Sequence, residues 1–205
     1  MTKKLLVGLA LGFSVVAMGN VNLANATDFD FSGALRAHND VLLVNFTTTT
    51  DTTVTLFSSS WIDGNAGFDP MLGLWDSLGN KIYFQDDGHN VGSTMSNGTS
   101  YYHGTWDSFY IKDVVAGTYT VSLTTYSNFN NGNLLSDGFQ YDGQAPIAFA
   151  VWDEPANGYQ TGNYAFHVLN VDTASSNHDV PEPATMLLFG AGLAGLAGVR
   201  LRRKN

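Results

Sequence analysis

The fold is decided by residues 118–126, which read TYTVSLTTY. Tyr119, Val121 and Leu123 alternate with threonine and serine, and successive side chains of a strand point to opposite faces of a sheet. The stretch therefore predicts a β-strand with one buried face and one face in water.

Short apolar runs separated by turn residues fill the rest of the body. We expect strands at residues 41–46, 53–57, 71–75, 81–85, 108–112, 147–152 and 164–169, with a tight hairpin turn at 77–80. Longer loops are expected at 58–68 and 88–101, and an irregular segment at 128–146. The pattern predicts an all-β domain over residues 27–176, an antiparallel β-sandwich or jelly roll of about eight strands.

The first 26 residues have the features of a signal peptide. Lys3 and Lys4 precede an almost wholly apolar run at 5–18, and Ala24 and Ala26 form the small-x-small pattern that signal peptidase accepts. We expect a signal helix and a mature chain that begins near Thr27. The alternative, a buried hydrophobic helix, fits the flanking lysines and alanines less well.

The last segment, residues 177–205, has three parts in order. A Val180, Pro181, Glu182, Pro183 motif comes first, and sixteen residues without charge follow at 184–199. At ~1.5 Å per residue, a helix of that length just spans a thin bilayer, so a transmembrane helix is predicted. A basic tail at 200–204 completes the segment and contains Arg200, Arg202, Arg203 and Lys204. These charges favour the cytoplasmic side and leave the body outside.

This C-terminal arrangement resembles the PEP-CTERM sorting signal of exopolysaccharide-producing Gram-negative bacteria. The resemblance implies recognition by an exosortase in the inner membrane, with cleavage near Glu182. The expected location is therefore transient anchoring in the inner membrane, followed by the outer surface or the extracellular matrix. A plain C-terminal membrane anchor is the alternative.

The body carries a second resemblance, over roughly residues 28–172. Its motifs come in a fixed order at 67–76, 78–80, 86–88, 107–108 and 115–123, and include a DDG turn and the run VAGTYTVSL. This progression resembles the bacterial pre-peptidase C-terminal (PPC-like) domain. That family implies a jelly-roll sandwich of the kind found in surface proteins and beside secreted proteases.

The charge balance of the body excludes whole classes of function. Only Arg36, Lys81 and Lys112 are basic there, against eighteen acidic residues, which leaves fifteen net negative charges. Such a surface repels nucleic acid and attracts divalent cations. The chain has no cysteine, so thiolate metal sites and disulfides are excluded.

Catalysis is not expected. None of the five histidines lies in an HExxH motif and no GxSxG motif occurs, so surface positions are expected for all five, His38, His89, His103, His167 and His178. Nothing in the sequence pairs any two aspartates in the way that a glycosidase requires. No cofactor is required on this interpretation.

Calcium is the one ion that the sequence favours. Asp86 and Asp87 flank a turn that ends at Gly88, and Asp107 joins them if the following strand returns alongside. An ordinary Asx turn is the alternative. Asp28 and Asp30 copy the opening of an EF-hand loop, but a strand with inward aromatic side chains is the better interpretation there.

Two of the four tryptophans, Trp61 and Trp106, lie in or beside loops. Exposed aromatic rings stack on sugar rings, although packing beneath a loop is the alternative. The expected function is a non-catalytic surface or matrix (exopolysaccharide- or biofilm-associated) protein, with signal peptidase and exosortase as partners. A module that binds extracellular polysaccharide, with or without calcium, is the alternative, and a secreted hydrolase is third.

Overall fold

The computed structural model describes residues 26–61 and 67–177. The strands of these residues are β1 (Thr27–Ala34), β2 (Leu42–Thr48), β3 (Thr52–Ser58), β4 (Pro70–Trp75), β5 (Lys81–Gln85), β6 (Gly92–Ser96), β7 (Thr99–His103), β8 (Phe109–Val114), β9 (Gly117–Thr125), β10 (Asp153–Glu154), β11 (Gly158–Tyr159), β12 (Asn163–Val171) and β13 (Thr173–Ser176). Two short 3₁₀ helices, η1 (Leu135–Asp137) and η2 (Phe149–Val151), complete the described elements. The predicted signal helix and transmembrane helix lie outside the described residues.

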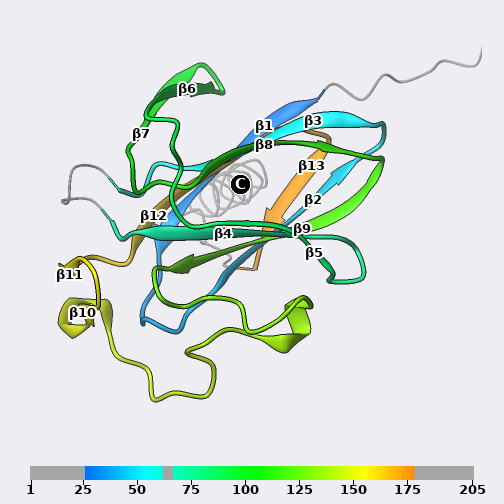
Figure 1. Ribbon diagram of the computed structural model, residues 1–205. Helices are drawn as coiled ribbons and strands as arrows, with labels where there is room; N and C mark the ends of the chain where they lie inside the picture. The colour runs from blue at the N-terminus through cyan, green and yellow to red at the C-terminus, as the bar shows by residue number, and fades with distance from the viewer. Residues whose placement is uncertain (1–25, 62–66, 178–205) are drawn as a thin grey trace, which may run out of the picture.

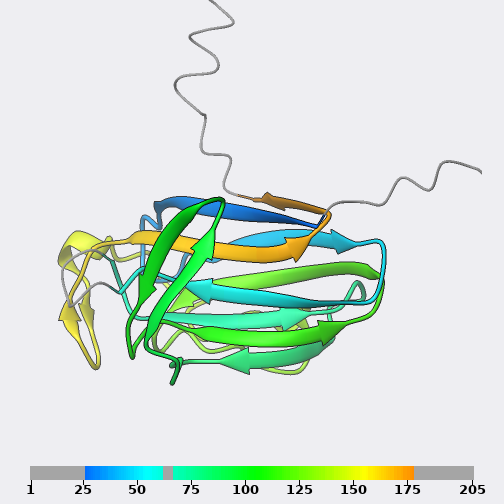
Figure 2. The same cartoon turned by 90° about the horizontal axis from the view of Figure 1, so that it is seen from above.

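Two antiparallel sheets form the body (Figures 1 and 2). One has the strand order β1-β12-β3-β8 and the other the order β13-β2-β9-β4-β5. Nine strands therefore make up the two main sheets, and the pairs β6–β7 and β10–β11 are separate two-stranded hairpins. The expected all-β class with antiparallel sheets is confirmed.

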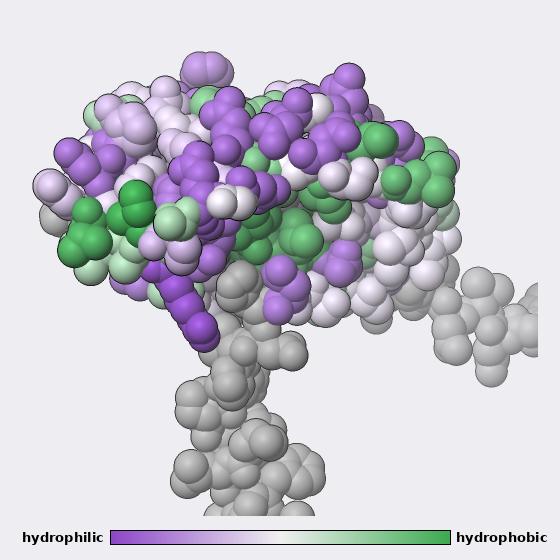
Figure 3. Space-filling model, turned by 90° about the horizontal axis from the view of Figure 1, so that it is seen from below, coloured by the Kyte–Doolittle hydropathy of each residue, from purple (hydrophilic) through white to green (hydrophobic). Residues whose placement is uncertain are grey.

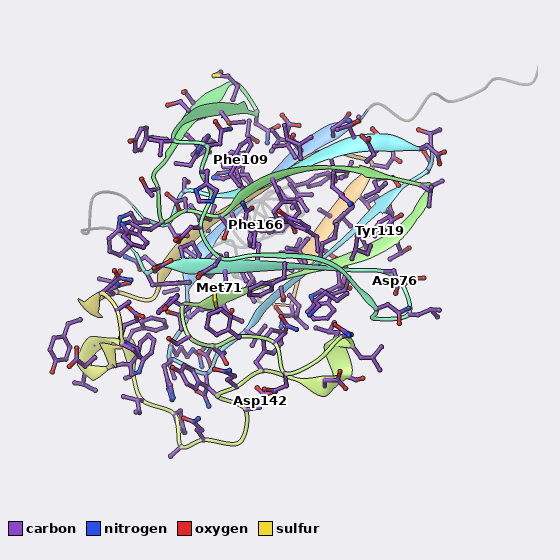
Figure 4. The ribbon with its side chains drawn as sticks, viewed as in Figure 1. Met71, Asp76, Phe109, Tyr119, Asp142 and Phe166 are labelled. Atoms are coloured by element: carbon purple, nitrogen blue, oxygen red, sulfur yellow. The ribbon has the colours of Figure 1, made fainter. Side chains whose placement is uncertain are left out.

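The hydrophobic core lies between the two sheets. Alternate side chains of β9, namely Tyr119, Val121 and Leu123, enter it from the centre of the five-stranded sheet, as the TYTVSLTTY pattern predicts. Phe166 of β12 enters from the opposite sheet and is fully buried (Figure 4). The period of two thus gives each sheet one apolar inner face.

The outer face of the five-stranded sheet is buried around β4. Met71 and Trp75 alternate with core residues of β4, yet both are 0% exposed. The Trp75 indole Nε1 donates to Ser122 Oγ on β9 at 3.0 Å. The segment 126–152 runs below this sheet in Figure 1, and Phe129 packs on Phe84 of β5 with ring centroids 6.0 Å apart. Seen from below, this part of the molecule is mostly hydrophilic with small apolar patches (Figure 3).

Hairpin β6–β7 lies against the outer face of the four-stranded sheet (Figures 1 and 2). Phe57 is fully buried outside the main core, where its ring contacts His103 of β7 and His167 of β12 at 5.5 and 4.4 Å. The sandwich therefore has a small second cluster of rings beneath the hairpin.

Several expectations need correction. Residues 147–152, predicted as a strand, contain helix η2, and the predicted loop 88–101 contains β6 and the start of β7. The expectation of surface histidines is wrong for His38, His103 and His167, which are 2%, 1% and 1% exposed. Each has a hydrogen-bond partner on at least one ring nitrogen and packs against an aromatic ring.

The inner and outer faces of the four-stranded sheet can be compared by mutation. Phe166→Ala removes a fully buried ring between the sheets and should lower the free energy of unfolding by about 3–5 kcal/mol. Ile111→Ala on β8 of the same sheet, where the side chain is 60% exposed, should cost about 0.5 kcal/mol. Urea unfolding of the mature domain measures both. Equal losses would mean that the two sheets do not share the core described above.

Candidate metal centre

Three carboxylates converge where β4 begins and β5 ends. Asp69 directly precedes β4, and Asp86 and Asp87 directly follow β5. Because β4 and β5 are antiparallel and Leu72 lies opposite Gln85, these two chain positions meet at one edge of the sandwich. One ligand oxygen from each carboxylate lies within 4.8 Å of the other two. In Figure 4 the labelled Met71, two residues beyond Asp69, marks this start of β4.

Asp69 is almost completely enclosed, with 1% of its surface exposed. Its Oδ2 accepts a hydrogen bond from Asn157 Nδ2 at 2.8 Å, and its backbone N–H donates to Gln160 Oε1 at 3.1 Å. Both partners lie in or just after the hairpin β10–β11, and Figure 1 shows that hairpin at the same end of the molecule. The carboxylate is therefore held in place by polar groups that do not neutralise it.

Buried oxygen atoms without donors gather at this edge. Oδ1 of Asp69, Oδ1 of Asp86 and Oδ1 of Asp87 are buried and have no hydrogen-bond partner among the described residues. The same holds for Oε1 of the adjacent Gln85. Buried polar atoms are almost always partnered in folded proteins, so several unpartnered acceptors together point to a missing positive group.

The electrostatics agree with this interpretation. Burial, together with repulsion from Asp87, raises the pKa of Asp69 to about 8, although the Asn157 hydrogen bond opposes the rise. Burial and the negative charges of Asp87 and Glu154 raise the pKa of Asp86 to about 6, and burial also raises that of Asp87. Glu154, 2% exposed on β10, thus adds a fourth acidic group nearby. A bound cation would remove the repulsion and return the carboxylates to their ionised form.

Calcium fits the donor set better than zinc does. The three side chains offer only carboxylate oxygens, and a calcium ion binds such oxygens at about 2.3–2.6 Å. Two ligand oxygens up to 4.8 Å apart can therefore share one calcium ion. Zinc sites favour histidine and cysteine, which the cluster lacks.

Asp107, the third ligand named from the sequence, has a different place in the structure. Its Oδ1 accepts hydrogen bonds from Ser58 Oγ, Ser60 N and Trp61 N at 2.8, 2.8 and 3.0 Å. Its Oδ2 accepts one from Gly104 N at 2.9 Å. The Asp107 carboxylate thus connects two loops through hydrogen bonds. Asp69 is the third member of the acidic cluster in its place. Calcium ligation by Asp86 and Asp87 stays a prediction.

Gly88 connects the Asp86–Asp87 turn to Asp107 through the main chain. The Gly88 N–H donates to the Asp107 carbonyl oxygen at 2.7 Å. A Cβ atom at this position would lie 2.4 Å from that same oxygen, so only glycine allows the approach. This contact explains why the turn ends in glycine and why Asp107 lies near it without joining it.

The two loop tryptophans lie together. The ring centroids of Trp61 and Trp106 are 6.3 Å apart in an edge-to-face arrangement, and Trp106 is 41% exposed. Asp107 fixes both segments, because it accepts the N–H of Trp61 and directly follows Trp106. Trp61 is half-buried, so the pair combines packing with an exposed aromatic edge. Sugar stacking on this pair stays a prediction.

Comparison with known families identifies one segment. Residues 179–204 match the PEP-CTERM protein-sorting motif. This motif implies an exported protein that is held transiently in the membrane and processed by an exosortase. No curated protein matches the chain. The resemblance to the PPC-like domain stays a prediction.

The sorting motif and all but the last residue of the predicted signal peptide, Ala26, fall outside the described residues. Val180, Pro181, Glu182 and Pro183 belong to the matched range, and Ala24 belongs to the predicted signal peptide. Across residues 26–61 and 67–177, no helix has the length and apolar character needed to cross a membrane.

Calcium should stabilise the mature domain through this cluster. At a hundredfold excess over Kd, a ligand of the native state adds about 2.7 kcal/mol, which raises the Tm of a domain of this size by roughly 5–10 °C. Asp69→Asn and the Asp86→Asn/Asp87→Asn pair should each abolish that rise. Differential scanning calorimetry with calcium, magnesium and a sodium salt of matched ionic strength measures the effect.

A matched control is available on the same domain. Asp113→Asn and Asp153→Asn remove two acidic groups outside the cluster and should keep the full calcium response. Screening alone stabilises any acidic protein, so a sodium response equal to the calcium response would contradict a specific site.

Proposed function

We propose that the mature domain is a non-catalytic surface or extracellular-matrix protein whose sandwich is locked by a calcium ion. The single observation that carries this proposal is the buried cluster of Asp69, Asp86 and Asp87 with unpartnered oxygens. The sorting motif supports the extracellular location, since it implies export and exosortase processing.

A calcium site fits an extracellular location. Extracellular calcium modules bind with Kd values of roughly 10⁻⁴–10⁻³ M, so they fill outside the cell and stay empty in a calcium-poor cytoplasm. The body carries fifteen net negative charges, and self-repulsion of this size weakens a compact fold. Calcium therefore stabilises the domain only after export, where the protein is needed.

The described end of the domain lies close to the sorting motif. β13 is the edge strand of its sheet, and the Asn177 N–H donates to the Leu43 carbonyl oxygen at 2.8 Å. Glu182 follows only five residues after Asn177. Since a residue spans at most ~3.6 Å, the bond cleaved near Glu182 lies within about 18 Å of the sandwich. The exosortase must therefore act beside the folded domain.

Processing can be tested at the motif itself. Glu182→Ala should leave an unprocessed, membrane-held precursor whose body folds normally, because the motif is lost while the membrane span and the sandwich are unchanged. Cell fractionation with immunoblotting measures the ratio of precursor to released protein. Asp153→Ala, which removes an exposed acidic side chain of the sandwich outside the matched range, is the control and should be released normally. Release of the Glu182 variant at the normal rate would contradict exosortase recognition at this site.

Polysaccharide binding is the second candidate function. The Trp61–Trp106 pair favours it, because Trp106 presents an exposed ring held by a fixed loop. Stacking of this kind contributes about 0.5–1.5 kcal/mol. We expect Trp106→Ala to weaken binding to the exopolysaccharide of the producing cells up to about tenfold in affinity electrophoresis. Tyr159→Ala, at a 71% exposed aromatic residue elsewhere, is the control. Equal mobility of all three proteins in gels with and without polysaccharide would contradict this function.

A further inference from the structure

Three polar side chains form a chain of hydrogen bonds across the four-stranded sheet, away from the metal centre. Asp30 of β1 lies directly opposite His167 of β12, which in turn lies opposite Phe57 of β3. Ser59 is two residues beyond Phe57 and so projects from the same face. This is the outer face, which hairpin β6–β7 covers in Figure 2.

The hydrogen bonds use the two ring nitrogens in a definite order. His167 Nδ1 lies 2.6 Å from Asp30 Oδ1, and His167 Nε2 lies 2.9 Å from Ser59 Oγ. Serine nucleophiles of hydrolases are activated through this same order of atoms: the hydroxyl faces Nε2 and the carboxylate faces Nδ1. Such a constellation is recognised by geometry, whatever the order of the residues in the chain.

The protonation states follow from the surroundings. Burial opposes ionisation of Asp30, but hydrogen bonds from Ser96, Asn97 and His167 bring its pKa below the usual value. Burial lowers the pKa of His167, with Asp30 opposing the shift and His103 adding to it. Asp30 is therefore ionised and can only accept, so the proton of neutral His167 resides on Nδ1. The Nε2 lone pair then faces the Ser59 hydroxyl.

We propose that Ser59 is a nucleophile activated by His167 and Asp30, and that it accepts an acyl group from a carboxylic ester. Ser59 Oγ forms a bond to the carbonyl carbon while its proton passes to His167 Nε2. The carbon–oxygen bond to the leaving alcohol then breaks, and the alcohol takes that proton. The product is an ester at Ser59, with no change of oxidation state.

The backbone around Ser59 makes the reaction slow. The Ser59 N–H donates to the Ala165 carbonyl oxygen at 2.9 Å, and the N–H groups of Ser60 and Trp61 donate to Asp107. These three groups are thus unavailable to stabilise an oxyanion, and loss of one such donor typically slows an enzyme about 10²–10³-fold. Ser59 is therefore a slow acyl acceptor, which agrees with a non-catalytic domain.

Access to Ser59 depends on hairpin β6–β7. Ser59 is 6% exposed. The ring centroids of Tyr101 on β7 and His167 are 4.1 Å apart. Asn97 at the hairpin turn holds Asp30 Oδ2 at 2.9 Å. The hairpin is not part of either main sheet, so it can lift when the Asn97 hydrogen bond and the packing of His103 on Phe57 open. Truncation of Tyr101 should widen the opening while leaving the three reacting residues in place.

A fluorophosphonate probe tests the proposal, because its phosphorus takes the place of the ester carbon and fluoride is the leaving group. The full chain in detergent is incubated with the probe, and the modified residue is located by peptide mass spectrometry. Ser58 and Ser60 are internal controls, since their hydroxyls donate to Asp107 and to the Ala165 carbonyl oxygen. We expect modification at Ser59 alone, at least fivefold faster in Tyr101→Ala.

Two further variants separate activation from a structural role. His167→Gln retains an amide donor and acceptor but no base, and Asp30→Asn disturbs the proton on Nδ1; both should slow labelling at least tenfold while circular dichroism stays native. Absence of the probe from Ser59 in both the wild type and Tyr101→Ala would overturn the proposal. So would equal labelling of Ser58, Ser59 and Ser60, or labelling that persists unchanged in a folded His167→Gln protein.

Discussion

Mutual repulsion of buried carboxylates is the constraint on which this structure depends. Asp69, Asp86 and Asp87 meet at the edge where β4 begins and β5 ends, and Asp69 is almost fully enclosed. The pKa of about 8 at Asp69 means that, without a cation, this group is neutralised by a proton near neutral pH. A folded-state pKa above the unfolded value contributes stability at low pH, which is lost as the pH rises through the folded pKa. A bound calcium ion would remove this penalty and allow the strand ends to stay together in neutral water.

Many segments depend on this edge. The Asp69 carbonyl oxygen accepts from Tyr126 N at 2.7 Å, which starts the segment that covers the five-stranded sheet. Asn157 connects hairpin β10–β11 to the same residue, and Gly88 connects the acidic turn to Asp107. Asp107 in turn fixes the loops that carry Trp61 and Trp106. A cation at the cluster would thus stabilise the cover, the small hairpin and the aromatic pair at once.

The sequence predicted what local pattern determines and missed what the topology brings together. The alternation at 118–126 placed β9, and the apolar strand at 81–85 was correct to the residue. Strands β6 and β7 show no alternation of apolar and polar residues, because they contain polar residues such as Ser93, Thr94 and Ser100. The sequence therefore gave no signal for them. Helix η2 replaced a predicted strand at residues 147–152, where only Phe149 and Trp152 enter the core while Ile147 and Val151 are exposed.

The sequence predicted two of the three carboxylates of the candidate metal site. Asp86 and Asp87 were found because they are adjacent and precede a glycine, whereas Asp69 lies seventeen positions earlier and joins them only through the pairing of β4 with β5. The sequence analysis named Asp107 as the third ligand, but its carboxylate accepts four hydrogen bonds from the loops instead. His167 looked like a surface residue because hairpin β6–β7, which covers it, was expected to be a loop. Side chains joined across strands cannot be read from spacing alone.

Proton release on calcium binding tests the central claim most directly. With a pKa of about 8 at Asp69 and about 6 at Asp86, an ion that binds their ionised forms must displace about one proton at pH 7 and almost none at pH 9. Isothermal titration calorimetry of the mature domain, in buffers with different ionisation enthalpies, measures that number. The account predicts one calcium ion per chain with about one proton released at pH 7, and loss of the release in Asp69→Asn. Calcium binding without proton release at pH 7, or no binding at all, would contradict it.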